Sequence, residues 1–204
     1  YADPLSNIGN VFQDQGKFDE AIDAYQKAIL LNPNYAEAYN NMGNALKAQG
    51  KLEEAIENYT KALSLKPDYA DALSNLGNIL QEQGNLDEAI GAFKKAISLN
   101  PDYAEVYSNM GVALKDLGKL EESIVAHKKA LFLKPDYAGA YYNLGIAIQD
   151  QGKLDEAIDY YTRSILLNPY HAEAHQNLSF MLLKAGKIKE GLDENEWRWK
   201  TAKG

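Results

Sequence analysis

Hydrophobic and polar residues alternate with a helical period over the segments 36–49 and 52–65. In the first segment Ala38, Met42 and Leu46 fall on one side of a helix turning about 100° per residue, and polar residues occupy the other side. The second segment shows the same spacing, with an apolar residue at every third or fourth position. The pattern therefore predicts two amphipathic helices, each with an apolar face that another helix must cover.

This pair of segments returns every 34 residues along the chain, and prolines mark the period at Pro33, Pro67, Pro101, Pro135 and Pro169. Positions are numbered here from the first residue of each unit, so that Ala36 is position 1 of the second unit. A fixed period of this length predicts one continuous array of helical hairpins, an all-α solenoid, rather than a domain with a closed core. Six units follow one another, of which the last is atypical: 2–35, 36–69, 70–103, 104–137, 138–171 and 172–204.

Helix ends and close contacts are also marked in each unit. Gly50 supplies the left-handed residue that ends a first helix, and Pro67 stops the second. Asp68 is expected to cap the next helix, as are its equivalents Asn34, Asp102 and Asp136. Glycine inside a helix costs about 1 kcal/mol relative to alanine. Its recurrence at position 8 predicts a close helix crossing at Gly9, Gly43, Gly77, Gly111 and Gly145.

These recurring residues resemble the tetratricopeptide repeat (TPR) family. The second unit has the TPR pattern at Tyr39, Met42-Gly43, Ala55, Tyr59, Ala62 and Pro67. The resemblance covers essentially the whole chain and implies antiparallel helix pairs stacked into a right-handed superhelix, with first helices lining a concave face. The sixth unit departs from the pattern, with Ser179, Gly191 and Asn195 in place of glycine, alanine and an aromatic residue.

Composition narrows the classes of partner. The formal net charge of −8 argues against nucleic acid and against acidic membrane surfaces, which attract basic proteins. No apolar run approaches the ~18 residues of a membrane-spanning helix. The chain has no cysteine, which excludes disulfides and thiolate metal sites and suits a reducing compartment, so we expect a cytoplasmic location.

Catalytic patterns are lacking in the sequence. His127 occupies an aromatic slot and is expected in the core, whereas His171 and His175 lie four residues apart without a third metal ligand at a recognisable spacing. We therefore expect no catalytic residue, metal or cofactor, and predict that the chain alone is not an enzyme.

Asparagine recurs on the face that the apolar pattern leaves free. An amide both donates and accepts hydrogen bonds, as a peptide backbone does, so a row of amides would hold an extended peptide. Solubility or hydrogen bonding between repeats is the alternative role. The TPR superhelix of O-GlcNAc transferases is similar in this asparagine ladder, which implies binding of extended protein segments. The ladder consists of Asn7, Asn41, Asn75, Asn109, Asn143 and Asn177 at position 6 and Asn10, Asn44 and Asn78 at position 9.

Position 9 becomes apolar in the last three units, at Val112, Ile146 and Phe180. Val112 and Ile146 are therefore expected to anchor an apolar part of the ligand, unless a tightening superhelix or a further domain covers this stripe. Acidic residues at positions 2 and 13 edge the same face and favour a neutral to basic ligand. They are Asp3, Glu37, Asp71, Glu82, Glu105, Asp116 and Asp150.

The sequence thus predicts a protein–protein interaction module that binds an extended peptide. Two alternatives remain: a substrate-binding arm of a glycosyltransferase related to O-GlcNAc transferase, or a scaffold that self-associates through the array ends. Phe180 and Trp197 are the candidate contacts for another domain or chain, whereas Trp199 is expected to pack on the preceding helix. Tyr1 fits the last position of a preceding unit, so we expect the parent protein to be longer.

Overall fold

The computed structural model describes the backbone of residues 2–201 and the side chains of residues 2–197. Every regular element in this range is an α-helix, which confirms the all-α class. The helices are α1 (Ala2–Asp14), α2 (Phe18–Leu31), α3 (Ala36–Ala48), α4 (Leu52–Leu65), α5 (Ala70–Glu82), α6 (Leu86–Leu99), α7 (Ala104–Asp116), α8 (Leu120–Leu133), α9 (Ala138–Asp150), α10 (Leu154–Leu167), α11 (Ala172–Lys184) and α12 (Ile188–Thr201). None of these helices is both long and apolar enough to cross a membrane.

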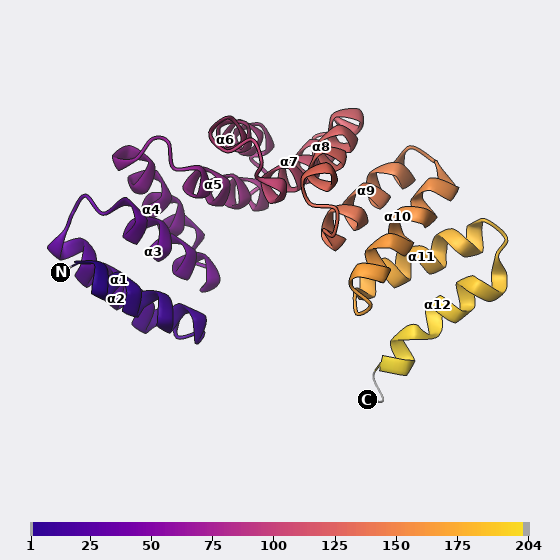
Figure 1. Ribbon diagram of the computed structural model, residues 1–204, viewed down its shortest axis with the longest axis horizontal. Helices are drawn as coiled ribbons and strands as arrows, with labels where there is room; N and C mark the ends of the chain where they lie inside the picture. The colour runs from indigo at the N-terminus through magenta and orange to yellow at the C-terminus, as the bar shows by residue number, and fades with distance from the viewer. Residues whose placement is uncertain (1, 202–204) are drawn as a thin grey trace. The chain divides into compact units, whose positions relative to one another are not determined.

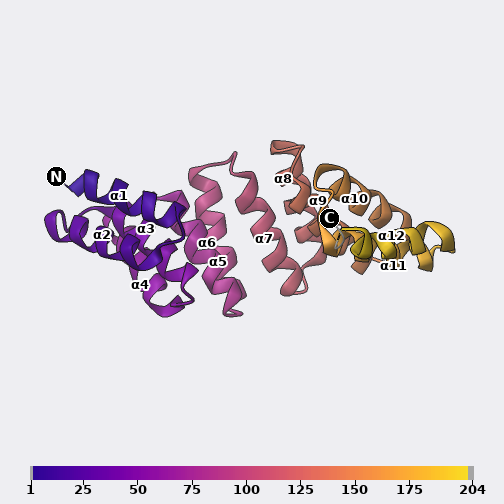
Figure 2. The same cartoon turned by 90° about the horizontal axis from the view of Figure 1, so that it is seen from below.

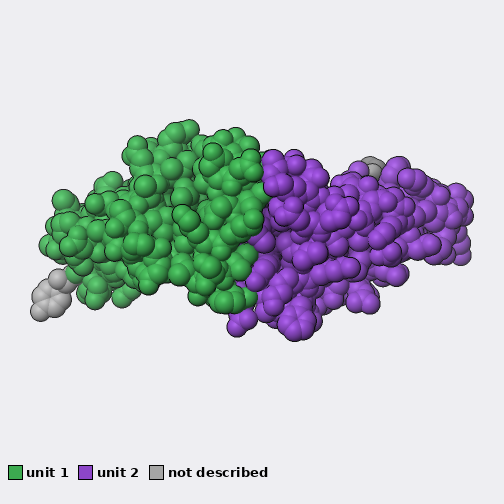
Figure 3. Space-filling view, turned by 90° about the horizontal axis from the view of Figure 1, so that it is seen from above, with its two compact units in different colours: residues 1–101 green, residues 102–204 purple. Residues whose placement is uncertain are grey.

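Each predicted unit is one helical hairpin, in which the first helix packs against the second from α1 with α2 through α11 with α12 (Figures 1 and 2). The chain divides into two compact units, Tyr1–Pro101 and Asp102–Gly204 (Figure 3). We call these two halves unit 1 and unit 2, and they are distinct from the 34-residue repeats, which are called the first to the sixth unit. Inside unit 1 the second helix of one hairpin packs on the first helix of the next, as α2 does on α3 and α4 on α5. The same contacts join α8 to α9 and α10 to α11 inside unit 2.

An aromatic ring explains the glycine at position 8. A Cβ added to Gly43 would lie 2.6 Å from Cε1 of Tyr59, a fully buried ring at position 24 of the same hairpin. Such a distance is shorter than a van der Waals contact, so only glycine lets the two helices approach this closely. The predicted close crossing is therefore confirmed, and the other ring contacts are Gly9 with Tyr25, Gly77 with Phe93, Gly111 with His127 and Gly145 with Tyr161.

The turn inside each hairpin is made as the sequence predicts. Gly50 has φ of +76°, and the N–H of Lys51 donates to the carbonyl of Leu46 at 3.0 Å. This bond closes the end of α3 around a left-handed residue, which glycine adopts without steric cost. The other five turn glycines have φ between +71° and +80°: Gly16, Gly84, Gly118, Gly152 and Gly186.

The predicted capping by Asp68 and its equivalents is wrong in register. Tyr69 is the N-cap residue of α5, and its side chain makes no capping hydrogen bond. Tyrosine likewise precedes α3, α7 and α9, so Asn34, Asp102 and Asp136 each stand one residue before the N-cap. The reason is the turn after the proline: Tyr69 N–H donates to the carbonyl of Lys66 at 3.2 Å, which delays the helix by one residue.

The last hairpin exchanges the small residues between its two helices. Gly191 of α12 faces Leu183, whose Cγ would lie 2.8 Å from an added Cβ. Ser179 of α11 stands at position 8, where the other hairpins have the glycine that contacts the ring. It is buried and donates from Oγ to the carbonyl of Gly191 at 2.7 Å. The departures seen in the sixth unit are therefore coordinated, because close helix packing is kept with the small residue on the other helix.

Candidate functional site

Four asparagines of unit 1 form an amide ladder across the first helices of its three hairpins. We define this amide ladder as Asn10 of α1, Asn41 and Asn44 of α3, and Asn75 of α5. The three in α3 and α5 are half-buried, whereas Asn10 is exposed. The ladder lies at positions 6 and 9, which the hydrophobic pattern leaves outside the apolar arc.

Consecutive hairpins are joined through the ladder. Nδ2 of Asn41 donates to Oδ1 of Asn10 at 3.0 Å, and Nδ2 of Asn75 donates to Oδ1 of Asn44 at 3.0 Å. The position-6 amide of one hairpin thus binds the position-9 amide of the hairpin before it. Hydrogen bonding between repeats, the alternative role considered for these residues, is therefore present in unit 1.

A buried tyrosine holds each position-9 amide from inside its own hairpin. The hydroxyl of Tyr25 donates to Oδ1 of Asn10 at 2.8 Å, and that of Tyr59 donates to Oδ1 of Asn44 at 2.7 Å. Burial, with a smaller contribution from the charge of Asp14, raises the pKa of Tyr25 to about 12. Burial raises the pKa of Tyr59 as well, so both hydroxyls stay protonated donors at neutral pH. The orientation of the position-9 amides is consequently fixed.

The ladder retains hydrogen-bonding groups for a ligand. Each position-9 oxygen already accepts two bonds, but Nδ2 of Asn10 and of Asn44 donates to no described residue. The buried Asn40 donates to Oδ1 of Asn41 at 3.2 Å and accepts from Asn75 at 3.1 Å. Oδ1 of Asn75 has no donor within the described part of the chain, so it is left as an acceptor beside these two Nδ2 groups.

Unit 2 carries different chemistry at the same positions. Val112 and Ile146 are half-buried, and Phe180 is 59% exposed. Ile146 packs against the core of unit 2, and Nδ2 of Asn177 reaches the hydroxyl of Tyr142 at 3.4 Å. The printed hydrogen bonds thus join the four amides of unit 1 described above into a ladder. The remaining predicted ladder residues are Asn7, Asn78, Asn109, Asn143 and Asn177, and their part in binding stays a prediction.

Lysines neutralise part of the acidic edge. Lys66 binds Glu37 at 3.0 Å, and this hydrogen bond holds the pKa of the Glu37 carboxyl below its usual value. Lys134 acts on Glu105 in the same way at 2.7 Å, while Glu82 pairs with Lys47 of the preceding hairpin at 2.8 Å. Paired carboxylates attract a basic ligand less, because the lysine charge cancels most of their field at a distance.

Trp197 has a partner inside the chain. Its ring stacks on His175 with centroids 4.0 Å apart, and Nδ1 of His175 lies 2.6 Å from Oε2 of Glu194. A further contact of Trp197 with another chain stays a prediction, as does that of the exposed Phe180. The side chain of Trp199 lies outside the described residues. Over residues 2–197, no group of three His, Cys, Asp or Glu side chains is placed to hold a metal ion.

Sequence reasoning missed Tyr25, Tyr59 and Asn40 as members of the network around the ladder. The sequence holds a partial signal for the tyrosines: tyrosine at position 24 accompanies asparagine at position 9 in the first two units, although Phe93 accompanies Asn78 in the third. Where position 9 becomes Val112, the tyrosine becomes His127. In the fifth unit, with Ile146 at position 9, the Tyr161 hydroxyl donates to Gln149 instead, at 2.8 Å. Asn40 gives no such signal, since position 5 varies from unit to unit.

Comparison with known proteins agrees with this architecture. The family model described as TPR repeat matches residues 9–50, 43–84, 77–118 and 111–152, and that described as Tetratricopeptide repeat matches 138–171. No match to the chain is found among curated proteins.

Solved structures supply three points of comparison. MamA is 31% identical, with a TM-score of 0.71 over 81% of this chain and 97% of that one. PilW, a type IV pilus biogenesis factor, is 19% identical, with a TM-score of 0.87 over 95% and 90%. YrrB, described as a TPR protein with an unusual peptide-binding site, is 24% identical, with a TM-score of 0.68 over 92% and 93%. The matched repeats span most of the chain, which therefore belongs to the tetratricopeptide repeat family.

Proposed function

We propose that the chain is a non-catalytic protein-interaction module that binds an extended peptide along its first helices, with the amide ladder of unit 1 contacting the peptide backbone. The observation that carries this proposal is the pair of position-9 Nδ2 groups, on Asn10 and Asn44, that the fold orients but does not use. Such preoriented donors suit peptide carbonyls, because little side-chain freedom is lost on binding.

The first two hairpins each leave one position-9 donor group, and this repetition suits recognition of backbone rather than of particular side chains. Oδ1 of Asn75 adds an acceptor for a peptide N–H. A chain in extended conformation exposes both kinds of group, whereas a helix has already paired them internally. We therefore infer an extended ligand segment with little sequence preference where it contacts unit 1.

Specificity is assigned to unit 2. Val112 and Ile146 put apolar surface at the positions where unit 1 has amides, and would take an apolar side chain of the ligand. Asp116 also pairs with a lysine, Lys115, at 3.1 Å, so the neutral to basic character proposed for the ligand rests on Asp3 and Asp150. The description of YrrB as peptide-binding, in a protein of the same family, supports a peptide as the class of ligand.

Substitution of Asn44 by aspartate tests the proposal cleanly. An aspartate carboxylate still accepts from Tyr59 and Asn75, but it lacks the Nδ2 donor that would bind the ligand. We expect affinity for uncharged, unstructured peptides, measured by fluorescence anisotropy, to fall about tenfold while the unfolding midpoint is kept. Unchanged affinity for such peptides would show that the ladder is only structural.

Asn44→Val is the matched comparison, because the fourth unit carries Val112 at this position. Valine removes the acceptor as well as the donor, so both peptide affinity and stability should fall. A role as the substrate-binding arm of a glycosyltransferase, self-association through the array ends and a cytoplasmic location remain predictions. The family match covers TPR repeats alone.

A further inference from the structure

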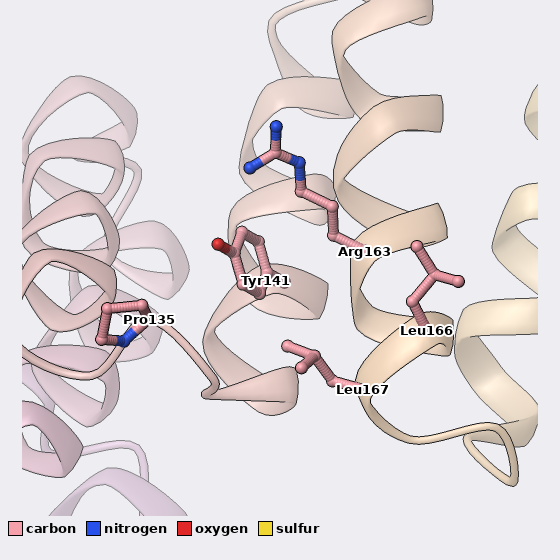
Figure 4. A pocket seen from close by; sticks show the side chains of 5 residues that line it. All are labelled: Pro135, Tyr141, Arg163, Leu166 and Leu167. Carbon is pink, nitrogen blue, oxygen red and sulfur yellow. The ribbon is translucent and has the colours of Figure 1, made fainter.

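Unit 2 has a shallow, largely open surface cavity that lies away from positions 6 and 9. Pro135 from the loop before α9, Tyr141 of α9, and Arg163, Leu166 and Leu167 of α10 line a hollow of about 230 Å³ (Figure 4). Figure 4 shows the Tyr141 ring between Arg163 and Leu167. The lining is apolar except for the Tyr141 hydroxyl and the guanidinium, and Leu166 remains 74% exposed.

Arg163 is exposed and contacts an aromatic ring rather than a carboxylate. Its guanidinium lies over the Tyr141 ring, 5.8 Å from the centroid, and that ring stacks in turn on Tyr160 at 6.4 Å. No carboxylate of the described residues approaches the guanidinium within 4.0 Å. Glu156 and Asp159 line an adjoining hollow with Tyr160 and Arg163. In a chain with a net charge of −8, an arginine that lies beside an apolar cavity without a carboxylate partner is unusual.

The preceding hairpin repeats the arrangement. Phe132 of α8 stands at the position of Leu166 and is 78% exposed, and Lys129 stands at the position of Arg163. Nζ of Lys129 lies 5.1 Å from the Phe132 ring centroid and 6.0 Å from that of Tyr107. An aromatic ring, a cation and an exposed apolar side chain therefore recur in two consecutive hairpins of unit 2. The second and third 34-residue repeats have Ser64 and Ser98 at the position of this exposed apolar residue.

We propose that this surface, formed by Phe132, Lys129 and the cavity around Arg163, docks an acidic segment of a partner protein that carries bulky apolar residues. One apolar side chain fills the cavity, and a carboxylate next to it pairs with Arg163, whose planar fork binds carboxylates in a bidentate manner. A second apolar side chain packs on Phe132, with its acidic neighbour at Lys129. Glu156 and Asp159 border Arg163 on the side of the adjoining hollow, so the ligand carboxylate approaches over the cavity.

Charge complementarity selects this partner. The cations of Lys129 and Arg163 lie over aromatic rings, which restricts their orientations before a ligand binds. A basic segment would meet Lys129 and Arg163 at the same place and be repelled. The surface is thus complementary to an acidic ligand, whereas the first helices are proposed to take a neutral to basic one, which makes it a second and separate interface.

The test uses a short fluorescent peptide with one phenylalanine and one leucine among aspartates and glutamates, and a matched peptide with lysine at every acidic position. We expect the acidic peptide alone to bind, more weakly as salt is raised. Arg163→Lys, which installs the residue of the first four units, should weaken binding about threefold, and Arg163→Ala about tenfold.

Leu166→Ser provides a variant that the fold accepts, since Ser64 and Ser98 occupy this position and Leu166 is exposed. We expect it to weaken binding of the acidic peptide about threefold, whereas Asn44→Asp should have no effect. Equal binding of the lysine peptide, or unchanged binding by the Arg163→Ala and Leu166→Ser variants, would overturn the proposal. Loss of the acidic peptide on Asn44→Asp would place it on the first helices and would also overturn it.

Discussion

His127 is a buried imidazole whose two ring nitrogens both lack a hydrogen-bond partner among the described residues. It fills the ring position of its hairpin, against Gly111, and is 1% exposed. Burial, aided by the nearby charge of Lys115, lowers its pKa to about 4. The neutral ring is thus accommodated as a hydrophobic residue, while its protonated form is strongly disfavoured in the folded state.

Acid should therefore destabilise the chain through His127. The pKa of an unfolded histidine is about 6.5, so below that value the unfolded state takes up a proton that the native state does not. Stability falls as the pH drops from about 6.5 towards about 4, with a loss of about 2 kcal/mol by about pH 5. Urea unfolding at about pH 6.5 and at about pH 5 measures this loss. His127→Phe, which copies Phe93 of the previous hairpin, should remove most of it. Equal pH dependence in the variant would contradict this assignment.

Two glycines distinguish a steric requirement for glycine from the low helix propensity of glycine. Alanine at Gly77 would place its Cβ 2.7 Å from Cε1 of the buried Phe93, so Gly77→Ala should destabilise by about 2 kcal/mol or more. Gly91 lies exposed inside α6 with no atom within 4 Å of an added Cβ, so Gly91→Ala should stabilise by about 0.5–1 kcal/mol. Chemical denaturation of both variants gives the comparison, and destabilisation by both would exclude the ring contact as the cause.

The amide ladder shows how far residue-level prediction reaches. The helical period assigns Asn41, Asn44 and Asn75 to one face correctly, because it needs only the angle per residue. It does not tell which atoms of these amides bind each other, because Asn44 and Asn75 meet through the stacking of two hairpins. The unused Nδ2 groups of Asn10 and Asn44 follow from that stacking and from the buried tyrosines, which the helical period does not specify.

At the scale of the element, local sequence signals predicted where the first helices end but not where the following first helices begin. Gly50 and its equivalents end the first helices because a left-handed residue is a local requirement that glycine meets. The start of the next helix depends on the turn after Pro67, in which Tyr69 bonds to Lys66 before the helix begins. The preference of aspartate for N-caps could not reveal this delay, since backbone geometry rather than side-chain chemistry sets the first residue.

Helix α12 is attached to α11 through His175, and this contact can be weakened selectively. Glu194 accepts at Nδ1 of His175, while Nε2 of the same ring lies 3.0 Å from the carbonyl of Pro169. Glu194→Gln should speed amide hydrogen exchange in α12 about tenfold, because a charge-assisted bond contributes about 1.5–3 kcal/mol. Glu196→Gln, an exposed substitution on the same helix, should leave exchange unchanged. Equal effects of the two variants would mean that the His175 contact does not hold α12.

At the scale of the whole molecule, equivalent residues differ in burial according to the neighbours of their hairpin. Val11 of α1 is 54% exposed, whereas Ile79 at the same position of α5 is 0% exposed and belongs to the core around Tyr59. The sequence period treats these two positions alike, and only stacking separates them. In a linear array, stability is approximately the sum of hairpin and interface terms, so burial should translate directly into local stability.

This difference predicts the effects of matched substitutions. Ile79→Ala should cost about 2–4 kcal/mol, because it leaves a cavity in the core, and Val11→Ala should cost less than about 1 kcal/mol. Urea unfolding followed by circular dichroism measures both. Comparable losses would mean that the outer face of α1 is covered in solution.

The joint between Asn75 and Asn44 also bears on how such a chain can change its length. The same joint links Asn41 to Asn10, so removing residues 36–69 as a whole would bring the Asn75 donor to the Asn10 acceptor. Within unit 1, a deletion or duplication of one full period therefore regenerates the bonds it interrupts, whereas one of another length destroys them. Such an array can therefore keep its amide bonds only when its length changes by whole hairpins.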